Sequence, residues 1–85
     1  MTEQLLTHHV YLLQSESNAS KFYKGYTKDI AARIAKHNRG EVSSTAKDLP
    51  WKLITLISFD SKEKALRFER YLKSHSGRAF SSKHF

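Results

Sequence analysis

Residues 8–14 read HHVYLLQ and residues 21–26 read KFYKGY, and these two stretches decide the fold. The first contains an unbroken apolar run at residues 10–13, and the second is short and rich in aromatic residues. Both features are typical of β-strands. The residues between them, 14–20, are polar and typical of a loop. The two stretches therefore predict an antiparallel hairpin.

A helix is predicted directly after the hairpin. Thr27 is a candidate N-cap, and Asp29 suits the first turn of a helix. The helix is expected to continue to about Asn38. Gly40 follows at the position where a glycine commonly ends a helix. A polar loop is expected over residues 41–49.

A third strand and a second helix complete the pattern. Residues 51–59 read WKLITLISF and contain strong β-formers. Asp60, with Glu63 three residues later, predicts the start of a helix that runs to about residue 74. The predicted order is ββαβα, which is a small α+β domain. We expect one domain over residues 1–85, with residues 1–7 and 78–85 as possible flexible tails.

The composition of the chain favours a polyanionic partner. All fifteen lysine and arginine residues follow residue 20, and the formal net charge is +7. Such a surplus favours nucleic acid, although a basic surface can also serve solubility alone. The 85 residues contain no cysteine, which excludes disulfides and thiolate zinc sites and fits a cytoplasmic location. No signal peptide and no membrane span are expected.

Both predicted helices carry polar residues on the stripe that faces the sheet. The stripe of the first helix consists of Ile30, Arg33, Ile34 and His37. The stripe of the second helix consists of Ala65, Phe68, Glu69 and Leu72. A buried carboxylate is costly unless it is paired or binds a metal, so these stripes predict a polar pocket.

Each of these polar residues also has an ordinary structural interpretation. Arg33 and Glu69 can form an ion pair at the edge of the core. His37 can interact with the dipole at the end of its helix. Tyr11 and Tyr23 can be core residues. Periodicity alone does not decide between these interpretations and a catalytic site.

Taken together, the residues resemble the GIY-YIG nuclease superfamily over nearly the whole chain. Its two signature triplets correspond to residues 9–11, HVY, and 23–25, YKG. Arg33, His37 and Glu69 then follow in the order and spacing of that superfamily. Further similar positions are Asn38, Gly40, Ser44, Thr45, Pro50, Trp51, Ala65, Leu72, Lys73 and residues 76–80. His9 and Lys24 depart from the triplets, and no asparagine follows Glu69.

The resemblance implies a small three-stranded antiparallel sheet flanked by helices, and a nuclease active site on its surface. The implied catalytic residues are Tyr11, Tyr23, Arg33, His37 and Glu69. Glu69 would hold one divalent cation, magnesium or manganese, because a single carboxylate with waters suits magnesium. Tyr11 would act as the general base for the attacking water or orient it. Arg33 would stabilise charge on the phosphate, and Gly25 would permit a close backbone approach.

The implied partner is DNA, with structured or branched DNA as one alternative, and a role in DNA repair or recombination would follow. No organic cofactor is expected. Plausible phosphate contacts are Lys24, Lys36, Arg39, Lys73 and Arg78, each of which can also be an ordinary solvated side chain. The alternative function is a non-catalytic module that binds nucleic acid through the same basic face. A third possibility is an interaction domain that recruits a nuclease.

Overall fold

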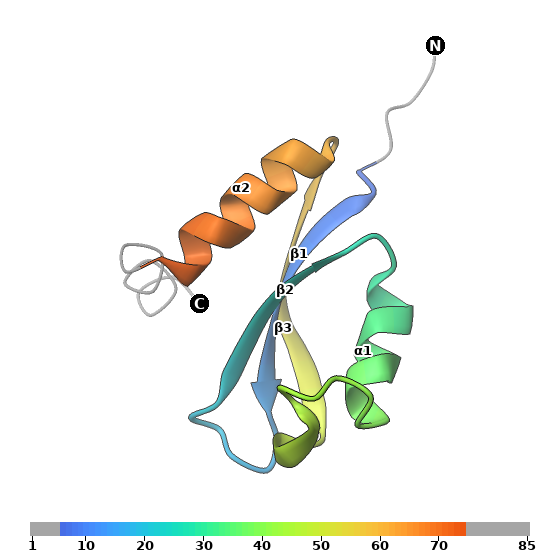
Figure 1. Ribbon diagram of the computed structural model, residues 1–85, viewed down its shortest axis with the longest axis vertical. Helices are drawn as coiled ribbons and strands as arrows, with labels where there is room; N and C mark the ends of the chain where they lie inside the picture. The colour runs from blue at the N-terminus through green and yellow to red at the C-terminus, as the bar shows by residue number, and fades with distance from the viewer. Residues whose placement is uncertain (1–5, 75–85) are drawn as a thin grey trace.

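The computed structural model describes residues 6–74 of the chain (Figure 1). Its elements are β1 (His8–Ser15), β2 (Phe22–Thr27), α1 (Ile30–Asn38), a short 3-10 helix η1 (Ala46–Asp48), β3 (Trp51–Phe59) and α2 (Lys62–Lys73). The predicted ββαβα order is confirmed. The one addition is η1, a single turn within the stretch that was expected to be a loop.

The three strands form one antiparallel sheet in the order β2-β1-β3. The central strand β1 is covered on both faces, because the side chains of residues 10–13 are all buried. A strand that is buried on both faces reads as a continuous apolar run rather than an alternating one. Tyr11 lies opposite Gly25 on β2 and opposite Leu56 on β3. The predicted α+β fold with its antiparallel sheet is confirmed.

The two helices cover opposite faces of the sheet (Figure 1). Val10 packs on one face with Ala65 and Leu72 of α2. Tyr11 and Leu13 pack on the other face with Ile30 and Ile34 of α1. Successive side chains of a strand point to opposite faces, which explains why adjacent residues of β1 belong to different cores.

Both helices begin one or two residues later than the sequence predicts. Asp29, rather than Thr27, is the N-cap of α1, and Ser61, rather than Asp60, is the N-cap of α2. Thr27 accepts a hydrogen bond from the backbone N–H of Asp29, and Asp60 forms an ion pair with Lys64. Two neighbouring Ser, Thr or Asp residues could serve as the N-cap of each helix. Which of them does so depends on the backbone conformation of the preceding turn.

The expected tails lie largely outside the described residues. Only Leu6 and Thr7 belong to the described part, and they precede β1 without regular structure. Between residues 6 and 74, no helix combines the length and the apolar character needed to cross a bilayer.

Candidate active site

A buried tyrosine hydroxyl lies at the centre of the predicted site. The side chain of Tyr11 is 1% exposed. Its hydroxyl lies 3.0 Å from Nε2 of His37, and Nε of Arg33 donates a hydrogen bond to it at 3.1 Å. Residues from β1 and α1 therefore meet at one oxygen atom.

The hydrogen bonds of His37 fix the direction of its contact with Tyr11. Nδ1 of His37 lies 2.8 Å from the hydroxyl oxygen of Thr45, which itself donates to the carbonyl of Val42 at 3.2 Å. A hydroxyl has one proton to donate, so the Thr45 oxygen accepts from Nδ1–H of the imidazole. A neutral imidazole then has a free lone pair at Nε2. Tyr11 therefore donates its O–H to His37.

The protonation of the cluster agrees with this direction. Burial, followed by the positive charges of Arg33 and Lys36, lowers the pKa of His37, so its imidazole is neutral near pH 7. Burial raises the pKa of Tyr11, although the hydrogen bond and charge of Arg33 oppose this shift. Tyr11 is therefore a neutral phenol whose proton lies between its own oxygen and Nε2 of His37.

Tyr23 forms the outer part of the same cluster. Its ring centroid lies 4.8 Å from that of His37 in an edge-on arrangement and 6.2 Å from that of Tyr11. The hydrogen bond to Tyr11 raises the pKa of Arg33, and the proximity of Tyr23 adds to this shift. Tyr23 and Arg33 are half-buried, whereas Tyr11 and His37 are buried. Four of the five predicted catalytic residues thus lie together. Tyr11 and His37 form the buried part of the cluster, and Tyr23 and Arg33 form its half-buried part.

Gly25 makes room for the central hydroxyl. A Cβ atom at this position would collide with the hydroxyl and ring of Tyr11. The close approach that was predicted at Gly25 is confirmed. The missing side chain lets Tyr11 cross β2 toward the edge of the sheet.

Two residues that hold the surroundings of His37 in place, Thr45 and Asn38, had no predicted role. Thr45 is fully buried, and its carbonyl accepts a hydrogen bond from the Trp51 indole at 2.8 Å. Asn38 bonds to both backbone groups of Trp51, at 2.7 and 3.1 Å. Gly40, with φ of 75°, ends α1 and allows the chain to turn back toward His37. Thr45 and Asn38 were noticed only as similar positions in the family pattern.

Glu69 lies on α2, the helix that covers the other face of the sheet. Its carboxylate pairs with Nζ of Lys73 at 3.3 Å and is 17% exposed. The proposed structural ion pair between Glu69 and Arg33 is therefore wrong. The negative charge of Glu69 is the smallest of the causes that raise the pKa of Tyr11, so its carboxylate lies within electrostatic range of the cluster.

A single carboxylate is the acidic group that the site offers to a cation. Within residues 6–74, no group of three or more histidine, aspartate or glutamate side chains is arranged to hold a metal ion. Magnesium commonly binds through one or two carboxylates and keeps several waters, which it shares with a substrate phosphate. Glu69, partly exposed and with a pairing partner that can exchange, fits this mode of binding.

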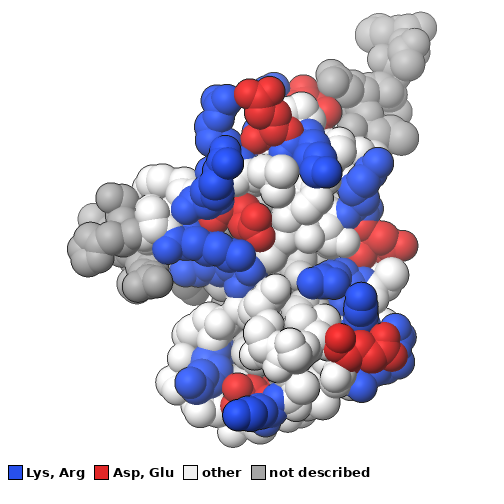
Figure 2. Space-filling model, viewed as in Figure 1, with Lys and Arg blue, Asp and Glu red and all other residues white. Residues whose placement is uncertain are grey.

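The four predicted phosphate contacts within residues 6–74 lie on different elements of the fold. Lys24 and Lys73 lie near each other where β2 meets the end of α2. Lys36 is on α1, and Arg39 is held in an exposed ion pair with Glu41 at 2.7 Å. Figure 2 shows basic side chains over both helices with acidic ones among them. Arg78 lies outside the described residues.

Comparison with known proteins identifies the family. The GIY-YIG catalytic domain profile matches residues 7–83. A UPF0213 protein of Halobacterium salinarum is 40% identical over 70 residues, which cover 81% of this chain and 88% of that protein. The solution NMR structure of a UPF0213 protein from Bacillus halodurans is 36% identical, with a TM-score of 0.53, and the match covers 88% of this chain and 79% of that one.

A nuclease subunit is also among the relatives. The structure-specific endonuclease subunit slx1 of Talaromyces marneffei is 42% identical over 65 residues, which cover 69% of this chain but 17% of that larger protein. The triplets, Arg33, His37 and Glu69 thus occur within a sequence that matches the family over most of its length. The chain belongs to the GIY-YIG family of nuclease domains.

Proposed function

We propose that the chain is a metal-dependent endonuclease that hydrolyses phosphodiester bonds in DNA. The observation that carries this proposal is the Tyr11 hydroxyl, which donates to a neutral His37 and accepts from Arg33. An ordinary core tyrosine needs one partner for its hydroxyl. Here the phenol has both a base to take its proton and a fixed cation to stabilise the resulting charge.

The proposed reaction uses Tyr11 and His37 as a proton relay. The attacking water gives a proton to the Tyr11 oxygen, and the Tyr11 proton moves to Nε2 of His37. The water oxygen forms a bond to phosphorus, the bond to the leaving oxygen breaks, and solvent protonates that oxygen. Arg33 remains bonded to the phenol oxygen and offsets negative charge in the transition state.

The different exposure of the two tyrosines assigns them different roles in this proposal. Tyr11 is buried, whereas Tyr23 and Arg33 are half-buried and cover it. The substrate phosphate would contact Arg33 and Tyr23, and Tyr11 would act from beneath them. The attacking water would have to reach the Tyr11 oxygen past these two side chains when the substrate binds.

Glu69 would hold the divalent cation, magnesium or manganese, together with waters and the substrate phosphate. A bound cation supplies Lewis acidity and stabilises the leaving oxygen. Lys73, which pairs with Glu69, would then be available to contact phosphate. The net charge of +7 supports DNA as the partner.

Purified chain incubated with DNA and manganese or magnesium is expected to cut at least one DNA structure. The panel consists of single strands, duplex, flaps and branched junctions with end labels, with an RNA strand for comparison. Cleavage should cease when EDTA removes the cation, because Glu69 then holds no Lewis acid. Salt-sensitive binding of the same DNA without any cleavage would instead favour the non-catalytic binding module.

Replacing Thr45 by valine is expected to slow cleavage about 10-fold or more. Valine keeps the shape of the side chain but cannot accept from Nδ1–H of His37. The imidazole can then adopt the tautomer with a proton on Nε2, which cannot accept from Tyr11. General-base catalysis contributes about 10² to 10⁴ in rate, and a fraction of that would be lost.

The Thr45→Ser variant, together with the pH profile, tests this role of Thr45 against simple destabilisation. Because the pKa of His37 is lowered, the parent should lose activity only when the pH falls below the ordinary histidine value of about 6.5. Stability should fall over the same window, because the unfolded chain binds the proton first. Thr45→Ser, which keeps the hydroxyl, should restore the parental rate. A valine variant with parental rate and pH profile would contradict the assignment.

A further inference from the structure

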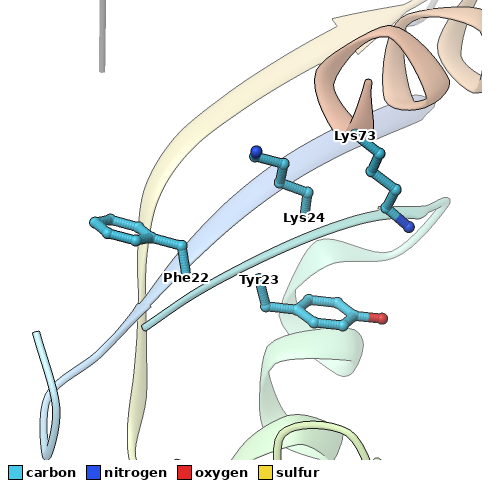
Figure 3. A pocket seen from close by; sticks show the side chains of 4 residues that line it. All are labelled: Phe22, Tyr23, Lys24 and Lys73. Atoms are coloured by element: carbon cyan, nitrogen blue, oxygen red, sulfur yellow. The ribbon is translucent and has the colours of Figure 1, made fainter. Parts of the chain in front are cut away.

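An open pocket of about 210 Å³ lies at the edge of the sheet formed by β2. It is lined by Phe22, Tyr23, Lys24 and Lys73 (Figure 3). Phe22 and Lys24 extend to one side of the strand, and Tyr23 extends to the other (Figure 3). Lys73 enters from the end of α2. The volume is smaller than that of a typical pocket for a drug-sized ligand, and suits a single flat ring.

The pocket adjoins the catalytic cluster through two of its residues. Tyr23 contacts His37 with its ring, and Lys73 pairs with the proposed metal ligand Glu69. A group that occupies the pocket would therefore be a direct neighbour of a phosphate held at Arg33 and Glu69. A nucleotide attached to that phosphate could therefore reach the pocket.

Phe22 has no core function that explains its position. Its side chain is 52% exposed on an edge strand, and it belongs to neither of the two core clusters of the described residues. Its exposed side chain therefore presents a ring to a ligand at this edge of the sheet. An exposed ring face beside basic side chains is the arrangement that single-stranded nucleic acid recognises.

The two lysines supply the charge for the same ligand. Lys24 donates from Nζ to the carbonyl of Leu72 at 3.2 Å, which holds its ammonium group at the end of α2. Lys73 is 52% exposed at its side chain. No acidic residue lines the pocket among the residues that the structure describes. The lining therefore combines one exposed aromatic ring with two cations, the chemistry that fits a nucleotide.

We propose that this pocket binds one unpaired nucleotide next to the scissile phosphate. Its base stacks on Phe22, and Lys24 and Lys73 contact its phosphate. A base inside a duplex has both faces covered by its neighbours, so only a single-stranded segment can stack in this way. The position of the nucleotide relative to the cut rests on the proposed nuclease function, whereas its binding does not. The substrate class is DNA with a single-stranded segment at the cleavage point.

The test measures binding in EDTA, so that cleavage does not enter the result. A fluorescein-labelled single-stranded oligonucleotide and the duplex of the same sequence are titrated with the protein, and anisotropy gives both affinities. The parent should bind the single strand, and Phe22→Ala should weaken that binding about 5- to 150-fold. The affinity for duplex should change less than twofold. Lys24→Gln and Lys73→Gln should each reduce the salt dependence of single-strand binding by about one log-log slope unit.

Matched variants separate stacking from general effects. Phe22→Trp keeps a ring and should retain the affinity, whereas Phe22→Leu keeps apolar area without a ring and should behave like alanine. Leu53 is 38% exposed on β3, the opposite edge strand, so Leu53→Ala also removes exposed apolar area. This variant should leave the affinity for the single strand unchanged. Phe22 is exposed, so its variants should melt within about 4 °C of the parent.

The outcomes distinguish the subsite from the nuclease function. Unchanged single-strand affinity in Phe22→Ala, or an equal loss for single strand and duplex, would overturn the subsite even if the parent cuts DNA. A selective loss in a chain that cuts nothing would support the subsite and count against the nuclease function.

Discussion

Replacing Tyr11 by phenylalanine is expected to reduce the rate of DNA cleavage by about 10² to 10⁴, the usual contribution of general acid–base catalysis. The change removes one oxygen atom and keeps the ring. That oxygen joins Nε2 of His37 to Nε of Arg33, so its loss interrupts the proposed relay between the attacking water and the imidazole. Rates are measured on the best substrate of the DNA panel at saturating cation.

The same variant should lose some stability. His37 is fully buried, and its Nε2 would lose its hydrogen-bond partner, which costs about 1–3 kcal/mol of unfolding free energy. Cleavage is therefore compared at a temperature well below the melting point of the variant.

Tyr23→Phe is the matched control for Tyr11→Phe. Its hydroxyl is on the half-buried outer side of the cluster, and its ring contact with His37 would remain. We expect a smaller loss of rate than for Tyr11→Phe. The opposite order would make Tyr23 the residue that takes the proton of the water. Parental cleavage by Tyr11→Phe would remove the relay altogether.

The fold could be predicted because its central strand has an unambiguous pattern. Residues 10–13 are apolar without a break, as expected for a strand that is covered on both faces. The helix starts were less certain, since Thr27 and Asp29 both suit an N-cap and lie two residues apart. Local turn geometry, which the residue types do not specify, selected Asp29.

The site was predictable only in part, for a related reason. Helical spacing places Arg33 and His37 on one face of α1, so their meeting with Tyr11 follows from local pattern once α1 packs on β1. The sequence does not reveal that α1 and α2 lie on opposite faces, or that Tyr11 is the residue that makes the close approach at Gly25. The hydrogen bond between Thr45 and His37 could not be predicted, because Thr45 lies in a loop whose residues show no periodic pattern.

The partner of Glu69 illustrates how local and long-range contacts compete. Arg33 was a candidate because both residues lie on inward stripes of their helices. Lys73, four residues along α2, is close in any helical conformation and needs no particular tertiary arrangement. The local pair is the one that forms. This result changes what is expected when the carboxylate is removed.

Replacing Glu69 by glutamine is expected to lower metal-dependent cleavage by about 10² to 10³, while the fold remains intact. The amide has nearly the shape of the carboxylate but binds a divalent cation far more weakly, so Lewis acidity and leaving-group stabilisation are lost. An ion pair with a buried Arg33 would have made the change cost about 3–5 kcal/mol of stability. The pair with Lys73 is local and partly exposed, so its loss should cost about 0.3–0.5 kcal/mol.

Glu63→Gln provides a matched control on the same helix. Glu63 also pairs with a basic residue four positions later, Arg67, at 2.9 Å, but its side chain is 79% exposed and lies in the first turn of α2. Both variants should melt within a few degrees of the parent, and only Glu69→Gln should lose cleavage. In EDTA, Glu69→Gln should bind DNA at least as tightly as the parent, because Lys73 loses its acidic partner. Parental cleavage by Glu69→Gln, or a melting point far below that of Glu63→Gln, would show that Glu69 is a structural residue and that the cation, if one is needed, is held elsewhere.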